Sequence, residues 1–410
     1  MSHSLTTCDF LIIGGGILGL SLGLQLKKTF GNSNIIIIEK EIDCGLHASG
    51  RNSGVLHAGF YYTSDSLKAK FTRLGNLALT EYCLQKNISI NRCGKLVVSR
   101  NEQDLFFLSE LLKRGQQNGV LLHELTDKEA KEIEPRVITY HKALFSPHTS
   151  SVDPKKIIDC LKADVQQEEI QIHYKTKYLK MKPHNIILTS KGKYQAGYVI
   201  NAAGLYADKI AKDFNFSKQY SILPFKGIYL YSNEPIHALR THIYPVPNLK
   251  NPFLGVHVTI TVDGRIKIGP TAIPAFWREQ YKLFNNFKLI ELMDILLKQV
   301  NLLMFSTFDF KSLAIEELKK YSKSSLVHLA KLLVADVKKE QFTRFGVPGI
   351  RAQLLNTKTK SLEMDFIVEG DKHSMHILNN VSPGFTSSFP FSQYIVDQIK
   401  CLITGAASCK

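Results

Sequence analysis

Three glycines and one acidic residue near the N-terminus have the types and spacing of a nucleotide-binding site. Gly14, Gly16 and Gly19 form G-x-G-x-x-G, and Glu39 follows twenty residues after the last glycine. The first glycine permits a tight turn, the second lets the backbone approach a pyrophosphate, and the third lets a helix pack on a strand. The acid can accept hydrogen bonds from ribose hydroxyls. The motif therefore predicts FAD or NAD rather than NADP, and does not separate the first two.

The flanking sequence predicts the elements that must hold these residues. Residues 9–13 and 35–38 are short apolar runs typical of buried parallel strands, and residues 20–30 have helical spacing. A helix that begins after the glycines would present free N–H groups and a positive dipole to a phosphate. Strand, turn, helix, strand and acid follow in the order of a Rossmann unit, so we predict a nucleotide-binding domain here.

The composition of residues 45–62 favours FAD over NAD as the cofactor. This segment is dense in Gly, Ser, Asn and His, where an NAD domain normally continues with another helix and strand. Small residues suit a backbone that passes close to a flat ring and its phosphates. An ordinary surface loop has the same composition, and that alternative stays open at this point.

Motifs along nearly the whole chain carry a family resemblance. Residues 49–70 read S-G-R-N-S-G-V-L-H-A-G-F-Y-Y-x-x-x-S-L-K-A-K. Further blocks in the same order lie at 93–97, 146–149, 203–208, 224–227, 243–247, 252–257, 349–353 and 382–388. Together they resemble the L-2-hydroxyglutarate dehydrogenases, also described as oxidases, of the FAD-dependent D-amino-acid-oxidase-like superfamily. One departure is Arg51, where family members often carry His.

The resemblance implies oxidation of L-2-hydroxyglutarate to 2-oxoglutarate, with FAD as cofactor and hydride passing to flavin N5. Oxidation of a secondary alcohol also needs a base for the hydroxyl proton, and histidine suits this because its pKa lies near neutrality. His57 lies in the glycine-rich segment and is predicted to be the histidine nearest to FAD. His257 is predicted to accept the proton or to contact the substrate. A structural role is the alternative for each, and the sequence does not rank them.

A 2-hydroxy dicarboxylate carries two negative charges and therefore needs cations. Arginine binds a carboxylate through two hydrogen bonds, and the resemblance places Arg351 at the α-carboxylate. Lys226 and Arg51 are candidates for the second carboxylate, and Tyr244 and Tyr61 could donate hydrogen bonds. The predicted catalytic residues are His57, His257 and Arg351, and the predicted substrate-binding residues are Arg351, Lys226, Tyr244 and Arg51.

The predicted cofactor-binding residues come from four segments of the chain. They are Gly14, Gly16, Ile17, Gly19, Glu39 and Lys40; Ser49, Asn52, Ser53, Gly54 and Val55; Ala203 and Gly204; and Pro383, Gly384, Phe385 and Thr386. The last segment precedes a helical stretch, and its N–H groups could stabilise negative charge on a reduced flavin. A plain helix N-cap is the alternative there. No metal site is predicted.

Composition and periodicity predict the remaining architecture. A chain of 410 residues with 44% hydrophobic and 21% charged residues is not a disordered polyelectrolyte, and it is long enough for two domains. We predict an α/β fold: a Rossmann-type, D-amino-acid-oxidase-like FAD-binding domain with a second α+β substrate domain on an antiparallel sheet. The FAD-binding domain is predicted at 1–90, 145–220 and 345–410, and the substrate domain at 91–144 and 221–344, with a helical region at 284–340.

The net charge of +16 raises the question of an acidic partner. The lysine-rich helical region could rest on an anionic membrane, although a solvated helical face fits the same pattern. Nucleic acid is not favoured, because the lysines are spread along the chain. Quinone or oxygen is the expected electron acceptor. We expect a cytoplasmic protein, with a peripheral position on the inner face of the membrane left open.

Seven cysteines without a C-x-x-C motif indicate a reducing compartment rather than a disulfide framework or zinc site. No basic segment precedes the apolar run 10–26, so no signal peptide is expected. That run is short for a membrane span and carries four glycines in its first ten residues. The alternative function is a related FAD-dependent oxidase or dehydrogenase that acts on glycerol 3-phosphate or an amino acid. An inactive flavin-binding protein is the non-enzymatic alternative.

Overall fold

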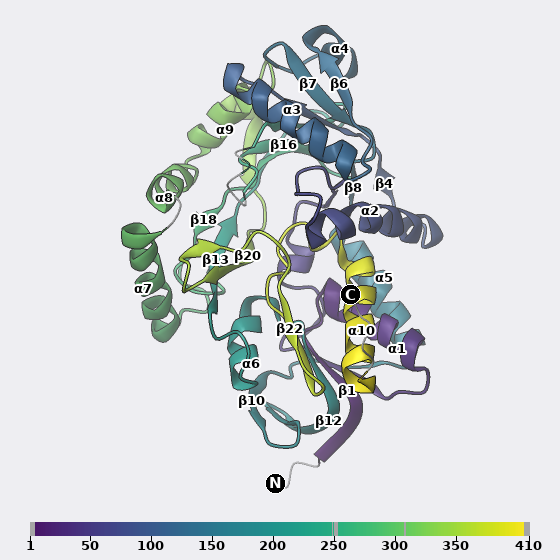
Figure 1. Cartoon of the computed structure of the whole chain (residues 1–410). Helices are drawn as coiled ribbons and strands as arrows, with labels where there is room; N and C mark the ends of the chain where they lie inside the picture. The colour runs from purple at the N-terminus through teal and green to yellow at the C-terminus, as the bar shows by residue number, and fades with distance from the viewer. Residues whose placement is uncertain (1–4, 248, 250–252, 307–308, 406–410) are drawn as a thin grey trace. The chain divides into compact units, whose positions relative to one another are not determined.

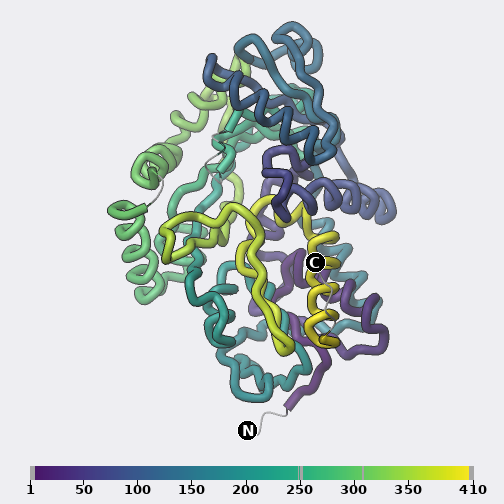
Figure 2. Tube along the Cα trace, viewed as in Figure 1, coloured from purple at the N-terminus to yellow at the C-terminus, as the bar shows by residue number. Residues whose placement is uncertain are grey.

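A computed structural model describes residues 5–247, 249, 253–306 and 309–405. The chain divides into two compact units (Figures 1 and 2). The first unit comprises Met1–Gly50, Pro154–Ile222 and Ala352–Lys410, and the second comprises Arg51–Asp153 and Leu223–Arg351. Residues 51–90, which we assigned to the FAD-binding domain, share most of their contacts with the second unit. The domain assignment by cofactor remains a prediction.

The first unit holds the Rossmann elements. They are β1 (Leu5–Ile13), α1 (Ile17–Phe30), β2 (Ile35–Ile38), η1 (Ala48–Gly50), α5 (Pro154–Gln167), β9 (Gln171–His173), β10 (Tyr178–Lys182), β11 (Ile186–Thr189), β12 (Gly192–Asn201), η2 (Gly204–Tyr206), α6 (Ala207–Asp213), β21 (Ser361–Leu362), β22 (Val368–Gly370), β23 (Ser374–Ile377) and α10 (Ser388–Thr404). Strands β13 (Tyr220–Gly227) and β20 (Gly349–Asn356) each contain a boundary between the units.

The sheet of the first unit is parallel at its centre. Strand order is β10-β11-β12-β1-β2-β9, with β23 paired to β12 and β22 to β23. β1 is parallel to both β2 and β12, and β2 is parallel to β9. All four residues of β2 are buried isoleucines, as expected for a strand covered on both faces. Helix α1 packs against α5 and α10, so chain segments far apart in sequence meet beside the glycine motif (Figure 2).

The second unit is built from many short strands and seven helical segments among the described residues. The elements are β3 (Val55–Leu56), α2 (Leu67–Gln85), β4 (Ile90–Asn91), β5 (Lys95–Val98), α3 (Glu102–Gln117), β6 (His123–Thr126), α4 (Asp127–Ile133), β7 (Lys142–Ser146), β8 (Ser150–Val152), β14 (Leu230–Ser232), β15 (His242–Pro245), β16 (His257–Ile260), β17 (Ile266–Gly269), β18 (Ile273–Pro274), α7 (Leu289–Phe305), α8 (Phe310–Lys319), α9 (Lys323–Lys331), η3 (Lys339–Gln341) and β19 (Phe342–Phe345).

Side-chain caps define the start of three helices in this unit. Ser66, Asn101 and Thr126 each accept a hydrogen bond from a backbone N–H in the first turn of α2, α3 and α4. These residue types satisfy N–H groups that have no partner inside the helix. At α4, Glu129 completes a reciprocal capping box with Thr126, which fixes the point where strand β6 turns into helix.

The large sheet of the second unit is antiparallel apart from one pair. Its strand order is β19-β14-β17-β16-β15-β5-β7-β6, and only β15 and β5 run parallel. The antiparallel β14–β17 part confirms the sheet that alternation predicted between residues 220 and 270. The three helices α7, α8 and α9 lie within residues 284–340, the region expected to be helical.

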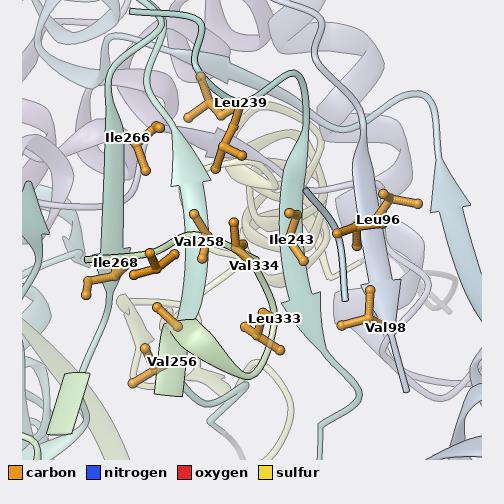
Figure 3. Close-up of a cluster of buried hydrophobic side chains, with 14 of the residues drawn as sticks. Leu96, Val98, Leu239, Ile243, Val256, Val258, Ile266, Ile268, Leu333 and Val334 are labelled. Carbon is orange, nitrogen blue, oxygen red and sulfur yellow. The ribbon is translucent and has the colours of Figure 1, made fainter. Parts of the chain in front are cut away.

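The two faces of this sheet differ sharply in chemistry. One face carries apolar side chains such as Leu96, Ile243 and Val258, which pack with Leu333 and Val334 beyond α9 (Figure 3). Side chains alternate along a strand, so the neighbouring residues point to the opposite face. That face contains Lys95, His242, Tyr244, His257, Thr259 and Lys267, all of them buried. We call this set the polar face. Burying polar groups is unfavourable unless they are partnered, so a face with six buried polar side chains is a candidate functional site.

Most of the described cysteines are free thiols. Cys8, Cys44, Cys83, Cys93 and Cys160 are free thiols, whereas Cys401 is disulfide-bonded. Within the described ranges, no helix combines the length and apolarity that a bilayer span requires.

Candidate active site

The glycine motif of the first unit has the close backbone approaches that its sequence predicted. Gly14 has a positive φ of 116°, and a Cβ there would lie 2.6 Å from the Ala202 carbonyl oxygen. A Cβ on Gly19 would lie 1.9 Å from the Gly14 carbonyl oxygen. Both positions therefore exclude any side chain. The N-terminus of α1 follows directly, and its Ile17 N–H donates to Ser49 Oγ at 3.0 Å.

Glu39 is placed at the carboxyl end of β2, beside the glycine turn. Its carboxylate accepts hydrogen bonds from the N–H of Gly15 at 2.8 Å and from the N–H of Glu41 at 2.9 Å. The side chain is buried, so these bonds fix an acceptor next to the turn. Lys40 instead contacts Glu41 and His47, with 2.8 Å between its Nζ and His47 Nε2. The cradle at the glycines and the fixed acid fit the adenosine end of FAD.

Two further segments of the first unit supply small-residue turns. Gly204 has φ of 52° at the start of η2, and a Cβ there would meet no atom within 4 Å. Gly384 precedes α10, where a Cβ would lie 2.4 Å from Asn380 Oδ1. The N–H of Ser387 donates to the Pro383 carbonyl at 3.0 Å, which closes the turn. The crowding at Gly384 makes glycine necessary there, whereas at Gly204 only the backbone conformation favours it.

The glycine-rich segment of the second unit is held by short-range bonds. Asn52 Oδ1 accepts from the N–H of Gly54 at 2.8 Å, and Val55 N–H donates to Ser53 Oγ at 3.3 Å. Lys267, from the polar face, donates from Nζ to the Ser53 carbonyl at 2.8 Å. The segment then enters β3, so the structure gives it a defined backbone rather than that of an unconstrained loop.

His257 on the polar face has the geometry of a proton acceptor. Its ring stacks on Tyr244 with 3.6 Å between centroids and 15° between planes. Its Nδ1 lies 3.0 Å from the Gly255 carbonyl oxygen, which can only accept. The proton must therefore sit on Nδ1, and Nε2 keeps its lone pair. Burial is the main reason that the pKa of His257 lies well below its usual value, so the ring is neutral.

His57 and His242 share this buried region. Burial, reinforced by the positive charge of Lys95, lowers the pKa of His57 to about 3. His242 accepts from the Ile260 N–H through Nδ1 at 3.0 Å, so its proton is on Nε2, which faces Cys93 Sγ at 3.3 Å. His242 therefore has both nitrogens engaged in structure. Sequence reasoning passed over His242, and its two contacts give it a structural role.

The predicted cations Arg351 and Lys226 lie near each other around Thr271. Arg351 Nη1 donates to the Thr271 carbonyl at 2.8 Å, and a Cβ on Gly227 would lie 3.3 Å from the same nitrogen. Thr271 Oγ1 donates to the Lys226 carbonyl at 2.9 Å. Lys226 Nζ is buried over the Tyr321 ring at 5.9 Å, and burial lowers its pKa.

Arg51 occupies a different environment from these two cations. Its guanidinium lies 4.2 Å from the Tyr281 ring centroid, and Nη1 donates to the Pro348 carbonyl at 3.4 Å. Two residues of this unit that sequence reasoning missed are Lys95 and Lys267, both buried on the polar face. The alternation of apolar and polar residues in β17 could have found Lys267, whereas β5, with the sequence Lys-Leu-Val-Val, gives no such signal for Lys95.

Comparison with known proteins places the chain in a family. The FAD dependent oxidoreductase family model matches residues 9–398. The human mitochondrial L-2-hydroxyglutarate dehydrogenase is 33% identical over 97% of this chain and 90% of its own. The enzyme of the same name from Indibacter alkaliphilus is 35% identical over 92% and 95%. This chain belongs to the L-2-hydroxyglutarate dehydrogenase family. The resemblance seen in its motifs is confirmed.

Solved structures support the fold of this family member. L-α-glycerophosphate oxidase from Mycoplasma pneumoniae, solved with FAD bound, has a TM-score of 0.75 at 22% identity and covers 97% of this chain and 95% of its own. Glycine oxidase from Geobacillus kaustophilus has a TM-score of 0.72 at 18% identity, with coverage of 98% and 96%. The predicted fold class and the FAD cofactor are confirmed. The chain is an FAD-dependent oxidoreductase.

Proposed function

We propose that the protein oxidises L-2-hydroxyglutarate to 2-oxoglutarate. The observation that carries the proposal is its similarity to curated L-2-hydroxyglutarate dehydrogenases over nearly the full length of both chains. The second unit supports it, because it contains a buried neutral histidine, His257, and two cations, Arg351 and Lys226, that both adjoin Thr271. Such a set suits an anionic substrate whose hydroxyl must lose a proton.

Each catalytic side chain has a proposed role. His257 accepts the hydroxyl proton at Nε2, since Nδ1 carries its proton toward the Gly255 carbonyl. Arg351 binds the α-carboxylate through the donors that Thr271 does not use. His57 lies nearest to the cofactor, Lys226 and Arg51 contribute positive charge, and Tyr244 orients the ring of His257 by stacking.

The cofactor site is proposed on the glycine motif, Glu39, the 49–55 segment and the two turns at 203–204 and 383–386. When bound, FAD supplies the hydride acceptor for the alcohol oxidation. The chain's own contribution to this site is a backbone that approaches closely at Gly14 and Gly19, an acid for ribose hydroxyls, and helix N-termini for negative charge.

A visible spectrum before and after anaerobic substrate addition tests the proposal. Bound FAD gives bands at about 370 and 450 nm, and the second band bleaches on reduction. We expect bleaching by L-2-hydroxyglutarate but not by D-2-hydroxyglutarate. If only glycerol 3-phosphate or an amino acid bleaches the band, the substrate proposal is wrong and the alternative oxidase is correct.

A matched pair of arginine variants tests the proposed carboxylate site. Arg351→Met should keep flavin but lose reduction by L-2-hydroxyglutarate by about 100-fold or more, the range for an uncompensated charged contact. Arg344→Met removes an exposed arginine that lies 5.3 Å from the ring of Tyr231. L-2-hydroxyglutarate should reduce the flavin of this variant at the same rate as that of the parent protein. Equal rates for both variants would exclude Arg351 as the carboxylate ligand.

We also propose that the electron acceptor is a quinone in an anionic membrane and that helix α7 contacts that membrane. The face of α7 that packs inward carries Glu291, Ile295, Gln299 and Leu302, so two of its four buried residues are polar. The outward face is apolar. Ile290 is 84% exposed, Leu297 68% and Met304 62%, and the preceding Leu283 and Phe284 are also exposed.

This arrangement is the reverse of a solvated helix, which buries its apolar stripe. Lysines are exposed in the same helical region and just before it, at positions 282, 288, 311 and 319. Apolar side chains framed by basic ones match the interface of an anionic bilayer, where the rings and aliphatic chains enter the acyl region and the lysines meet head groups. The composition of this surface therefore favours contact with lipid over exposure to solvent.

Flotation with vesicles tests this surface. We expect the holoenzyme to float with phosphatidylcholine–phosphatidylglycerol vesicles and much less with phosphatidylcholine alone. Leu297→Glu should release it, whereas Ile236→Glu, at a residue 61% exposed outside α7, should not. Unchanged flotation of Leu297→Glu, or no flotation of the parent protein, would contradict the membrane proposal while leaving the substrate proposal intact.

A further inference from the structure

Lys95 is the most unusual buried side chain of the polar face. It begins β5 and is 0% exposed. Its Nζ lies 4.6 Å from the ring centroids of Phe60 and Tyr61 and 4.8 Å from that of Tyr244. Within the part of the chain that the structure describes, Nζ has no hydrogen-bond partner, and the buried hydroxyl of Tyr61, whose ring it faces, has none either.

Three aromatic rings do not by themselves satisfy a buried ammonium. Cation–π contacts with well-placed rings recover only part of the free energy that an ammonium loses when it is removed from water. The ammonium also has three N–H donors, which rings replace poorly. Burial accordingly lowers the pKa of Lys95 to about 7. None of the described carboxylates forms an ion pair with it, so an anion that reached Nζ would supply what the protein does not.

The position of Lys95 links it to the proposed active-site histidines. Across the parallel β5–β15 pair it is the partner of His242, two residues before Tyr244. The Tyr244 ring lies near Lys95 Nζ and also stacks on the His257 ring. The charge of Lys95 also acts on His57 and His257, since it contributes to lowering the pKa of each.

The second carboxylate of the substrate still lacks a good ligand among the earlier candidates. Arg51 is held over Tyr281 and bonded to the Pro348 carbonyl, and Lys226 adjoins Arg351 through Thr271. A cation near Arg351 reinforces one carboxylate site rather than forming a second one. Lys95 instead shares the Tyr244 ring with His257, the proposed proton acceptor.

We propose that Lys95 Nζ and the Tyr61 hydroxyl form a binding site for the distal carboxylate of a dicarboxylate substrate. The site sets a preference for 2-hydroxy dicarboxylates over 2-hydroxy monocarboxylates. This inference rests on the proposed function, because it assigns the second charge of the same substrate. Lys95 is a binding residue here, and no bond is made or broken at it.

Two substrates that differ only in the distal carboxylate test the site. In Lys95→Met we expect kcat/KM for L-2-hydroxyglutarate to fall about 10- to 100-fold, as for a lost charge-assisted hydrogen bond. For L-2-hydroxybutyrate, which lacks the distal group, kcat/KM should change less than about 3-fold. Tyr61→Phe keeps the ring and removes the hydroxyl, and should lose about 3- to 10-fold with the dicarboxylate alone.

Lys267→Met is the matched control. Lys267 is also buried, with its Nζ 4.6 Å from the Tyr229 ring, but it donates to the Ser53 carbonyl. Its loss should affect both substrates by the same factor. If Lys95→Met behaves like Lys267→Met, Lys95 is structural and the proposal is overturned. Lys95→Arg serves if the methionine variant does not fold, and should retain the dicarboxylate preference.

A binding measurement separates this proposal from the proposed function. Glutarate should bind the parent holoenzyme more tightly than butyrate, and Lys95→Met should remove most of that difference. If L-2-hydroxyglutarate fails to reduce the parent flavin, the proposed function is wrong, and the glutarate comparison still decides whether Lys95 holds a carboxylate. Equal glutarate binding by the parent and by Lys95→Met would overturn the carboxylate site whichever substrate is correct.

Discussion

Gly19→Ala is expected to separate the first strand from the first helix. The new Cβ would lie 1.9 Å from the Gly14 carbonyl oxygen. Non-bonded heavy atoms come to rest at roughly 3.5 Å, so α1 must move away by more than about 1 Å. Overpacking of this kind costs about 1–3 kcal/mol or more, and the better helix propensity of alanine returns at most about 1 kcal/mol.

We therefore expect Gly19→Ala to lose about 2 kcal/mol, or roughly 4–8 °C in Tm. It should also lose FAD, because the N–H groups that we propose to bind the pyrophosphate move with the helix. Gly23→Ala in the same helix is the control. Its Cβ would lie 3.3 Å from Ile37 Cδ1, a side-chain methyl that can yield. That variant should melt within about 2 °C of the parent protein.

Thermal unfolding with and without added FAD, together with the ratio of 450 to 280 nm absorbance, measures both effects. These wavelengths are about those of oxidised flavin and of protein. If Gly19→Ala retains flavin and has the same Tm as Gly23→Ala, a Cβ at residue 19 does not displace α1. That result would mean that the close approach of Gly19 to Gly14 is absent from the folded protein.

Three further predictions concern single groups. Glu39→Gln should weaken FAD binding by about 10-fold in fluorescence titration, because a carboxylate accepts ribose hydrogen bonds more strongly than an amide does. The unfolding free energy of the parent relative to Lys95→Met should rise with pH between 7 and 10 in denaturant titrations, by at most about 1.4 kcal/mol per pH unit. The unfolding free energy rises because, between pH 7 and 10, Lys95 is protonated in the unfolded chain and mostly deprotonated in the folded protein. Thr126→Ala should cost about 1 kcal/mol without changing flavin content, since it removes the exposed cap of α4.

The sequence was most informative where structure depends on neighbours along the chain. The glycine turn, Ile35–Ile38 and Glu39 could be placed because each has a requirement that few residue types meet. Non-local pairing could not be foreseen: β5 lies parallel to β15, nearly 150 residues away. Lys95 was missed for the same reason, because the rings around it come from two distant segments, Phe60–Tyr61 and Tyr244.

The helical region shows a different limit of sequence reasoning. Leucine and isoleucine spacing predicted helices correctly, but it favours burial of the apolar side. In α7 the inward residues include Glu291 and Gln299, which bond to the Arg278 N–H and the Ala275 carbonyl. The inward side of α7 is thus set by backbone groups outside the helix, and the periodicity of the helix sequence does not reveal where those groups lie.

The three-segment construction of the first unit has a consequence for synthesis on the ribosome. Strand β1 emerges first, yet it pairs with β12, and α1 packs against α10 from the last segment of the chain. The glycine turn therefore cannot acquire its complete surroundings until translation is nearly finished. Until then the apolar faces of α1 and β12 remain uncovered, which lengthens the interval in which a chaperone is useful. Loading of the flavin should accordingly be a post-translational event, and a nascent chain halted before Ala352 should not retain it.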